Sequence, residues 1–358
     1  MGDLRVRPLR EVHAVVPAGI DDPDLVSGGN AYDRHLLDGL RKTGWAVDEH
    51  PVAGTWPHPD AGSLERLAAV VADVPPHGLL LVDGLVGCCA ADVLVPAAAR
   101  LRLVVLVHLP LGLADPAAAR QERRVLNAAS LVVATSDWTR RALFDAYALD
   151  PDTVQVARPG VGRASPALGT PEGGRLLCVA AVTAHKGHAD LVAALALVAD
   201  LSWSCTVAGS LDREPDVVAG LRRELSRSGL EERVHLVGPL HGADLERAYA
   251  GSDLLVLPSH VETYGMVVTE ALAHALPVVA TAVGGVSEAL GDTDDGPPGL
   301  LVPAGCPEAL TDALRSWLGD GGLRGRLRRR AARRRLDLAP WSRTAEQVSA
   351  ALAGVRDA

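Results

Sequence analysis

The chain has 358 residues, 44 Asp plus Glu against 35 Lys plus Arg, and a formal net charge of −9, a balance that argues against a general nucleic-acid binder. This length is sufficient for two domains. No apolar stretch reaches the ~18 residues of a transmembrane helix, and the N-terminus does not read as a signal peptide, so we expect a cytoplasmic protein.

Strand and helix patterns alternate along the first half, which predicts a parallel α/β arrangement. The apolar strand candidates are residues 11–16, 45–50, 79–82, 103–108, 131–135 and 154–157. Helices are expected between them, at residues 31–43, 63–72, 117–129 and 137–147.

The second half repeats the scheme. Strands are predicted at residues 175–180, 204–208, 234–237, 254–258 and 278–282, with helices at 188–197, 216–228, 245–250 and 266–275. Residues 163–174 are rich in Gly, Pro, Ala and Ser and are expected to link two domains, residues 1–162 and 175–340. Residues 341–357 follow Pro340 and form an amphipathic helix candidate.

Gly28 and Gly29 follow the first strand and a loop, and precede the helix expected from Ala31. Without Cβ atoms they let backbone approach a phosphate or sugar closely. The segment is not G-x-G-x-x-G, so no dinucleotide fingerprint is present. A turn without a ligand remains the alternative.

Two basic side chains lie where strands end and helices begin. His108 ends an apolar strand, where it can donate to a substrate hydroxyl; a structural histidine is the alternative. Lys186 precedes a helix start, where its charge suits a diphosphate, although an isolated Lys-Gly is mostly a surface feature. His13, His50, His185 and His241 carry no comparable signal.

The segment SHVETYGMVVTEALAHALPVVATAVGGVSE, residues 259–288, carries the strongest functional signal. Gly265 opens a helix whose free amides can bind an anion. Glu262 precedes this end, and Glu270 lies roughly 6–8 Å inside the helix. With a diphosphate at the helix end, each carboxylate could accept hydrogen bonds from one sugar ring. Two solvated surface glutamates are the alternative.

This segment resembles the donor-binding signature of retaining glycosyltransferases of the GT-B fold, specifically glycosyltransferase family 4. The resemblance implies two Rossmann-like domains facing each other across a cleft, with the C-terminal helix completing the first domain. It implies retaining transfer of a hexosyl-type sugar from a UDP- or GDP-sugar to an unidentified small-molecule or lipid-linked acceptor, held mainly by the first domain.

The resemblance also assigns roles to residues. Glu262, His108 and Lys186 would act in catalysis, and Glu270 would bind the ribose. The diphosphate would contact Lys186 and the backbone amides of two segments, which contain Gly28, Gly29, Tyr264, Gly265, Met266 and Val267. The loop after residue 237, with Pro239 and Leu240, would frame the nucleobase. Ala180 and Ala181 stand where the family usually has Gly-Arg, so one expected cation is missing.

No Asp-x-Asp metal clamp lies in a suitable loop, so we expect no metal and no cofactor, with protein cations and amides stabilising the departing diphosphate. A GT-B nucleotide-sugar epimerase or phosphorylase, and a non-catalytic nucleotide-sugar-binding protein, are the alternatives. An NAD-dependent dehydrogenase fails on the missing glycine fingerprint.

Residues 324–335 hold eight arginines. Docking to anionic lipid or nucleic acid would use such a tract. We favour a solvated helix face, because the tract is short and the rest of the chain is acidic.

Overall fold

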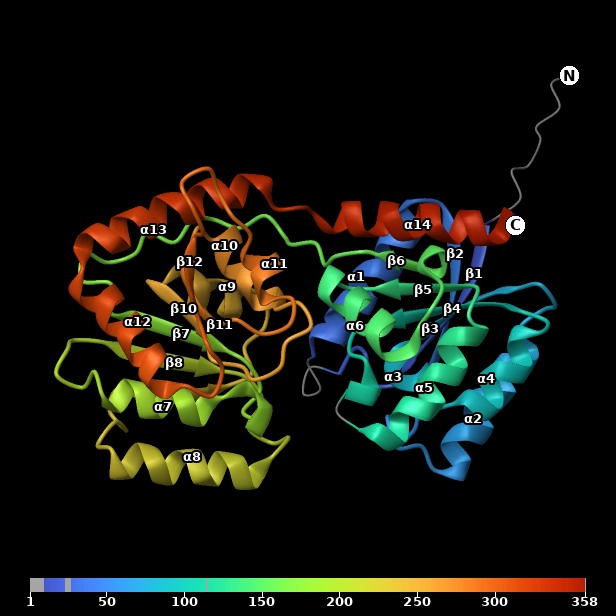
Figure 1. Ribbon diagram of the computed structural model, residues 1–358, viewed down its shortest axis with the longest axis horizontal. Helices are drawn as coiled ribbons and strands as arrows, with labels where there is room; N and C mark the ends of the chain where they lie inside the picture. Colours follow the sequence, from blue (N-terminus) through green and yellow to red (C-terminus); the bar gives the residue numbers. More distant parts are fainter. Residues whose placement is uncertain (1–9, 23–26, 114, 358) are drawn as a thin grey trace, which may run out of the picture. The chain divides into compact units, whose positions relative to one another are not determined.

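The computed structural model describes residues 10–22, 27–113 and 115–357. Residue contacts divide the chain into two compact units. The first contains Met1–Gly160 and Pro340–Ala358, and the second contains Val161–Ala339. Each is built on a parallel six-stranded sheet with helices around it (Figure 1). The predicted α/β class with two Rossmann-like halves is confirmed.

The sheet of the first unit has the strand order β2-β1-β3-β4-β5-β6, and every pair is parallel. The strands are β1 (Arg10–Pro17), β2 (Trp45–Val52), β3 (Leu79–Asp83), β4 (Arg102–Val107), β5 (Leu131–Ala134) and β6 (Val154–Val156). The interior residues of β1, β3, β4 and β5 are buried on both faces, as expected for strands covered by helices on both sides, whereas edge strand β2 is partly exposed.

Helices of the first unit divide between these two faces. They are α1 (Gly28–Lys42), α2 (Ala61–Asp73), α3 (Gly84–Gly87), α4 (Ala91–Ala98), α5 (Pro116–Ala128), α6 (Asp137–Tyr147) and α14 (Trp341–Asp357). Residues of α1 and α14 share one apolar cluster with β1, and those of α2, α4, α5 and α6 share the other. The short helices α3 and α4 were missed by the sequence analysis.

Helix α14 packs on α1 although it follows the whole second unit in the chain (Figure 1). A Cβ at Gly39 would lie only 2.4 Å from that of Ala345, so this glycine allows the two helices to approach closely. The Trp45 indole N–H donates to Ser349 Oγ at 2.9 Å, between buried side chains. These contacts make α14 an integral part of the first core.

The sheet of the second unit has the order β12-β11-β10-β7-β8-β9, again with parallel pairs. Its strands are β7 (Arg175–Val179), β8 (Ser204–Ala208), β9 (Val234–Gly238), β10 (Leu254–Leu257), β11 (Val278–Thr281) and β12 (Gly299–Val302). The helices are α7 (His188–Ala196), α8 (Pro215–Arg227), α9 (Gly242–Ala250), α10 (Met266–Ala273), α11 (Val286–Leu290), α12 (Pro307–Gly319) and α13 (Gly321–Arg334).

The segment 163–174, expected as a linker, is bound to the second unit. The Thr170 hydroxyl donates to Asp253 Oδ2 at 2.7 Å, and the Ala167 amide donates to the His274 carbonyl at 2.7 Å. The side chain of Asp253 is fully buried. This segment therefore adds contacts to the second unit along its length.

The arginine tract forms most of α13, and Arg326, Arg329 and Arg333 are exposed as expected for a solvated helix face, but other arginines of the tract bind neighbouring backbone. Arg328 donates to the Thr170 carbonyl and to Asp253, while Arg324 donates to the carbonyls of Trp317 and Leu318. Arginine fits this role because its guanidinium carries several donors in a fixed plane. Much of the tract is thus used to hold neighbouring backbone in place.

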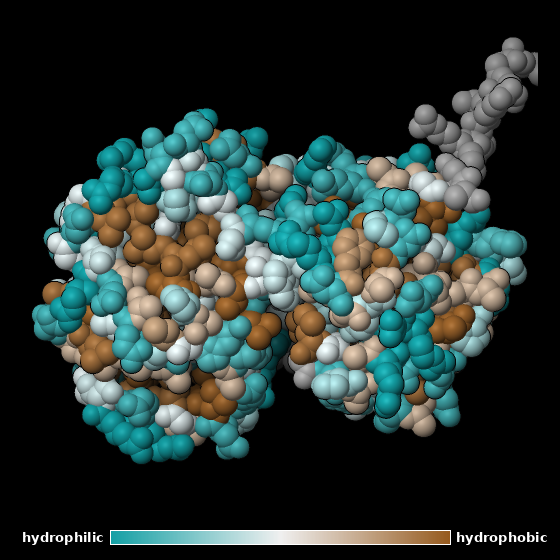
Figure 2. All heavy atoms as spheres, viewed as in Figure 1, coloured by the Kyte–Doolittle hydropathy of each residue, from teal (hydrophilic) through white to brown (hydrophobic). Residues whose placement is uncertain are grey.

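Figure 2 shows hydrophilic side chains interspersed with apolar ones over the visible face of each unit. On the visible face of the second unit the apolar side chains gather in contiguous areas (Figure 2). Within the described ranges, no helix has both the length and the apolar character needed to cross a membrane.

Candidate functional site

The N-terminus of α10 lies directly after the loop that follows β10. Its N-cap, Gly265, has φ +89° and ψ 61°, a left-handed conformation, and no side chain of the described chain caps the helix. The first amides of a helix have no partners within it, and the helix dipole adds positive potential there. Tyr264 is buried, whereas Met266 and Val267 are partly exposed. The predicted backbone anion site therefore has suitable geometry.

Glu262 lies beside this helix end and is joined directly to Lys186. The Lys186 ammonium donates to Glu262 Oε1 at 2.6 Å, and the Ser259 hydroxyl donates to the same oxygen at 2.9 Å. Both charged side chains are largely shielded from solvent, with 22% and 13% exposure. Two residues predicted separately, one for the diphosphate and one for the sugar, thus form a single ion pair.

Two glycines allow the loops that carry this pair to approach each other. Gly187 has φ +68°, and a Cβ there would lie 2.1 Å from the Pro258 carbonyl oxygen. Gly284 has φ +54°, and its Cβ would lie 1.5 Å from the Glu262 carbonyl oxygen. Neither distance is tolerable for a side chain, so both positions require glycine. Gly284 therefore supports the Glu262 loop directly.

Glu270 lies on α10 and is held by a buried tyrosine. The Tyr249 hydroxyl donates to Glu270 Oε2 at 2.7 Å, and the Tyr249 ring stacks on His274 at 4.9 Å. Burial raises the pKa of Glu270, although the Tyr249 hydrogen bond opposes the shift. Among the described residues Oε1 has no hydrogen-bond partner, and Glu270 is partly exposed, so this oxygen can accept from a ligand hydroxyl.

The remaining predicted positions of the second unit lie at the carboxyl ends of its strands. Pro239 and Leu240 follow β9, and Ala180 and Ala181 follow β7. The backbone segments after β7 and β8 approach each other closely at this edge, because a Cβ at Gly209 would lie only 2.0 Å from the Ala180 carbonyl oxygen. The site thus gathers along one edge of the sheet, where ligands of open parallel sheets bind.

In the first unit, Gly28 and Gly29 are the first two residues of α1, so the expectation of a loop before a helix beginning near Ala31 is wrong. Ser27 is the N-cap, and its Oγ accepts from the Asn30 amide at 3.0 Å. For the amides of Gly28 and Gly29, no hydrogen bond is recorded within the described residues. As the first amides of α1, they can still donate hydrogen bonds to a bound anion.

His108 directly follows β4 and lies against Gly29. A Cβ at Gly29 would lie 3.3 Å from Cδ2 of His108. Its Nε2 lies 2.7 Å from Asp33 Oδ1 and 3.4 Å from Asp83 Oδ2. Asp33 and Asp83 are both almost fully buried. Asp83 also accepts from the Leu85 amide at 2.6 Å, which fixes its position at the start of α3.

Charge in this cluster favours a protonated histidine. Burial alone would lower the pKa of His108, but the carboxylates of Asp33 and Asp83 raise it to about 10. Burial raises the pKa of Asp33 to about 7, against the opposing charge of His108. With Nε2 engaged, Nδ1 is the ring atom left to donate to a ligand, because it has no hydrogen-bond partner among the described residues and the His108 side chain is 19% exposed. His108 is therefore suited to donating hydrogen bonds, and not to acting as a base near neutral pH.

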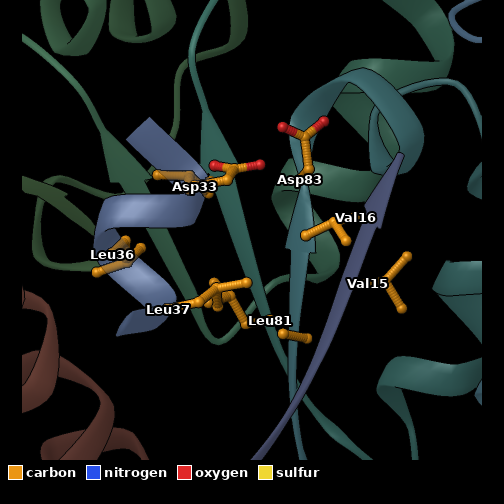
Figure 3. Close-up of a pocket in the computed structure, with 9 residues that line it drawn as sticks. Val15, Val16, Asp33, Leu36, Leu37, Leu81 and Asp83 are labelled. Carbon is orange, nitrogen blue, oxygen red and sulfur yellow. The ribbon is translucent and has the colours of Figure 1, made fainter. Parts of the chain in front are cut away.

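Asp33 and Asp83 also line a small pocket with apolar side chains of β1 and α1 (Figure 3). Asp33 Oδ2 is buried there without a hydrogen-bond partner among the described residues. The three side chains Asp33, Asp83 and His108 come close enough to be considered as metal ligands. The 2.7 Å contact between Nε2 and Oδ1 is nevertheless that of a charge-assisted hydrogen bond, so we assign an ion-paired cluster.

Sequence reasoning missed Tyr249, Ser259, Asp33 and Asp83. Asp83 ends a predicted strand next to the one that ends in His108, and this shared sheet edge is the signal that could have found it. Asp33 lies one helical turn after Gly29, a spacing that places both near His108. No local pattern marks Tyr249 as the partner of Glu270.

Comparison with known proteins shows a similar family for the second unit and a similar fold for the chain. Residues 173–320, most of the second unit, match the family described as Glycosyl transferases group 1. The whole chain has the fold of sucrose-phosphate synthase from Thermosynechococcus elongatus, with a TM-score of 0.79, 21% identity and coverage of 97% and 99% of the two chains. Residues 173–320 are therefore similar to group 1 glycosyltransferases, and the chain has a GT-B fold. The predicted GT-B glycosyltransferase resemblance is thereby confirmed.

A second solved structure has a similar fold. HepE from Anabaena, solved in complex with UDP and glucose, has a TM-score of 0.76 and 21% identity, with 96% of this chain and 99% of that chain covered. At such identities the likeness shows the fold alone.

Curated relatives carry the name D-inositol 3-phosphate glycosyltransferase. The protein from Kineococcus radiotolerans is 37% identical over 252 residues, which cover 63% of this chain and 57% of the relative. The protein from Actinosynnema mirum is 33% identical over 257 residues, covering 66% of this chain and 60% of the relative. The chain therefore matches less than two thirds of the length of either relative.

Proposed function

We propose that this protein transfers a hexosyl group from a nucleoside diphosphate sugar to a hydroxyl acceptor, with retention of configuration and without a metal ion. The observation that carries the proposal is the combination at α10: a helix N-terminus that no side chain of the described residues caps, the Lys186–Glu262 pair beside it, and Glu270 on the helix with Oε1 unpaired among the same residues. An anion-binding end flanked by two carboxylates suits a diphosphate with a sugar on each side.

In this proposal, Glu270 accepts hydrogen bonds from the ribose hydroxyls. Tyr249 holds Oε2, so that Oε1 is presented in a fixed orientation. Pro239 and Leu240 frame the base through backbone contacts. Two similar structures, complexes of HepE with UDP and with UDP-glucose, support a uridine donor as the first to test.

Glu262 binds a hydroxyl of the transferred sugar through the oxygen that Lys186 and Ser259 leave free. The ammonium of Lys186 and the amides of Gly265, Met266 and Val267 stabilise negative charge on the departing diphosphate. Preorganised donors of this kind act without reorganisation during the reaction. Lys186 then supplies part of the charge that the missing arginine at Ala181 would provide.

In the first unit, His108 can donate from Nδ1 to a ligand hydroxyl, while Asp33 and Asp83 keep it protonated. Gly28 and Gly29 have backbone amides without a hydrogen-bond partner among the described residues, and Gly29 lies against His108. The acceptor is an alcohol of unassigned structure. The name of the curated relatives makes inositol phosphate the first candidate acceptor.

The experiment that tests the proposal measures binding of UDP, GDP, ADP and their glucose conjugates by thermal shift and then by calorimetry. We expect one nucleotide series to stabilise the protein, and Glu270→Ala to abolish that shift. Product analysis with inositol phosphate as acceptor and α-configured donor follows, with retention read from the anomeric signals of the product. A protein that binds no nucleotide sugar, or whose binding survives Glu270→Ala unchanged, would contradict the proposal.

A further inference from the structure

Two histidines and an aspartate of the first unit converge on one point, in the middle of β1 and β2 and not at their carboxyl ends. His13 Nδ1 lies 3.1 Å from His50 Nε2 and 3.3 Å from Asp48 Oδ2. His50 Nε2 lies 3.3 Å from the same carboxylate oxygen. The three atoms therefore form a nearly equilateral triangle. None of these residues belongs to the site described above.

The fold explains how this triangle forms. β1 and β2 are adjacent and parallel, with His13 opposite Asp48 and Val15 opposite His50. Side chains two residues apart on a strand share a face, so Asp48 and His50 flank His13 on the same side of the sheet. Their backbone positions are fixed by the strand ladder, which gives the cluster a rigid base.

The spacing is that of metal ligands. Around a tetrahedral Zn²⁺ with bonds of about 2.0–2.2 Å, adjacent ligand atoms lie about 3.3–3.6 Å apart. The observed 3.1–3.3 Å requires only a small expansion of the triangle. At His108, by contrast, one carboxylate oxygen lies 2.7 Å from Nε2 and the other 3.4 Å, an uneven arrangement typical of an ion pair.

The side chains also leave an open side. His13 is buried and His50 is 22% exposed, whereas Asp48 is 55% exposed. An ion bound by the three atoms would keep a coordination position facing solvent, and imidazole nitrogens with one carboxylate suit Zn²⁺ and its first-row neighbours. Mg²⁺ and Ca²⁺ prefer sets made only of oxygen atoms.

We propose that His13, Asp48 and His50 form a site for a divalent first-row transition metal, with Zn²⁺ as the reference ion and water as the fourth ligand. The ion joins edge strand β2 to β1 and stabilises the first unit. It takes no part in sugar transfer, because its ligands lie mid-strand and belong to neither part of the transfer site. The competing interpretation is a histidine–histidine hydrogen bond beside a surface aspartate.

The test uses the full chain without a polyhistidine tag, treated with EDTA and dialysed before titration with Zn²⁺ in a calorimeter. We expect one Zn²⁺ per chain and an increase in Tm, since a ligand that binds only the folded state stabilises it. His50→Gln and Asp48→Asn should each weaken binding by about tenfold or more, as ligand loss costs at least as much as loss of a supporting partner. Both positions are partly exposed, so these variants should fold without metal.

The matched control is His58→Gln, which removes an exposed histidine of the same unit. It should bind Zn²⁺ like the unchanged chain. Co²⁺ gives a second reading, because tetrahedral binding produces a visible absorption band that His50→Gln should lose. Unchanged Zn²⁺ affinity in both His50→Gln and Asp48→Asn would overturn the site. So would equal affinity for Mg²⁺, or loss of binding in Cys306→Ala, which would locate the ion at a partly exposed thiol.

Discussion

The Lys186 ammonium contacts the Glu262 carboxylate at 2.6 Å and joins the loop after β7 to the loop after β10. The sequence predicts that Lys186 binds the diphosphate and Glu262 the transferred sugar, whereas in the structure the two side chains pair with each other. A ligand that binds here must therefore engage the pair as one unit.

We expect Lys186→Met to weaken nucleotide-sugar binding by about 1.5–3 kcal/mol, or roughly tenfold or more, because it removes a charged donor and leaves Glu262 partly buried without its cation. Calorimetry with the donor gives the measurement. Glu262→Gln and the double variant complete a cycle, and a coupling energy near zero would show that the two residues act independently.

Glu270→Gln should weaken binding of the free nucleoside diphosphate by about tenfold, because an amide group cannot accept through both of its terminal atoms. Tyr249→Phe should have a smaller effect, since the tyrosine only orients the carboxylate. Glu246→Gln is the matched control, because Glu246 pairs with His274 beside Tyr249 and is largely exposed. Equal losses in Glu246→Gln and Glu270→Gln would argue against ribose binding by Glu270.

His108 should make the stability of the protein fall as pH rises above neutrality. Its folded pKa is about 10, above the unfolded value near 6.5, so between these values the folded state holds a proton that the unfolded state has lost. This contribution is fully present below about pH 6.5 and disappears as pH passes through 10. Urea denaturation at pH 7 and pH 9 should show a smaller decline for His108→Gln than for the unchanged protein. Parallel declines would contradict the shift.

Turnover should be unchanged in EDTA, because protein cations and amides are proposed to stabilise the leaving diphosphate. Complete loss of activity that Mg²⁺ or Mn²⁺ restores would exclude metal-independent transfer. A lower Tm in EDTA with full activity is the combination expected if the His13 site is occupied and separate from catalysis.

Arg328→Met should lower the free energy of unfolding by about 2 kcal/mol, because it removes a charged donor from the buried Asp253 and from the Thr170 carbonyl. Arg329→Met is the control, as Arg329 is exposed and has no recorded interaction among the described residues; it should change stability by less than about 0.5 kcal/mol. Denaturant titration gives both values. Equal effects would favour a surface role for the whole tract.

Periodicity predicted most strands because each is a short apolar run bounded by turn residues, and β1, β4 and β10 lie within a residue or two of their expected limits. Helices α3 and α4 were missed: α3 is a single turn, and α4 contains Pro96, which argues against a helix. The roles of His108 and Glu270 stay predictions. Their partners Asp33, Asp83 and Tyr249 depend on contacts between distant segments, which local sequence does not encode.

The position of α14 has a consequence for synthesis on the ribosome. Val348 and Leu352 of this helix are buried in the same apolar cluster as residues of β1 and α1. Residues 10–160 of the first unit are translated before the second unit, but this core lacks its last helix until all of the second unit has emerged. Multidomain chains usually fold their N-terminal domain first. Here the second unit can complete its fold earlier, so the early intermediate is expected to have a native C-terminal half and an unfinished N-terminal one.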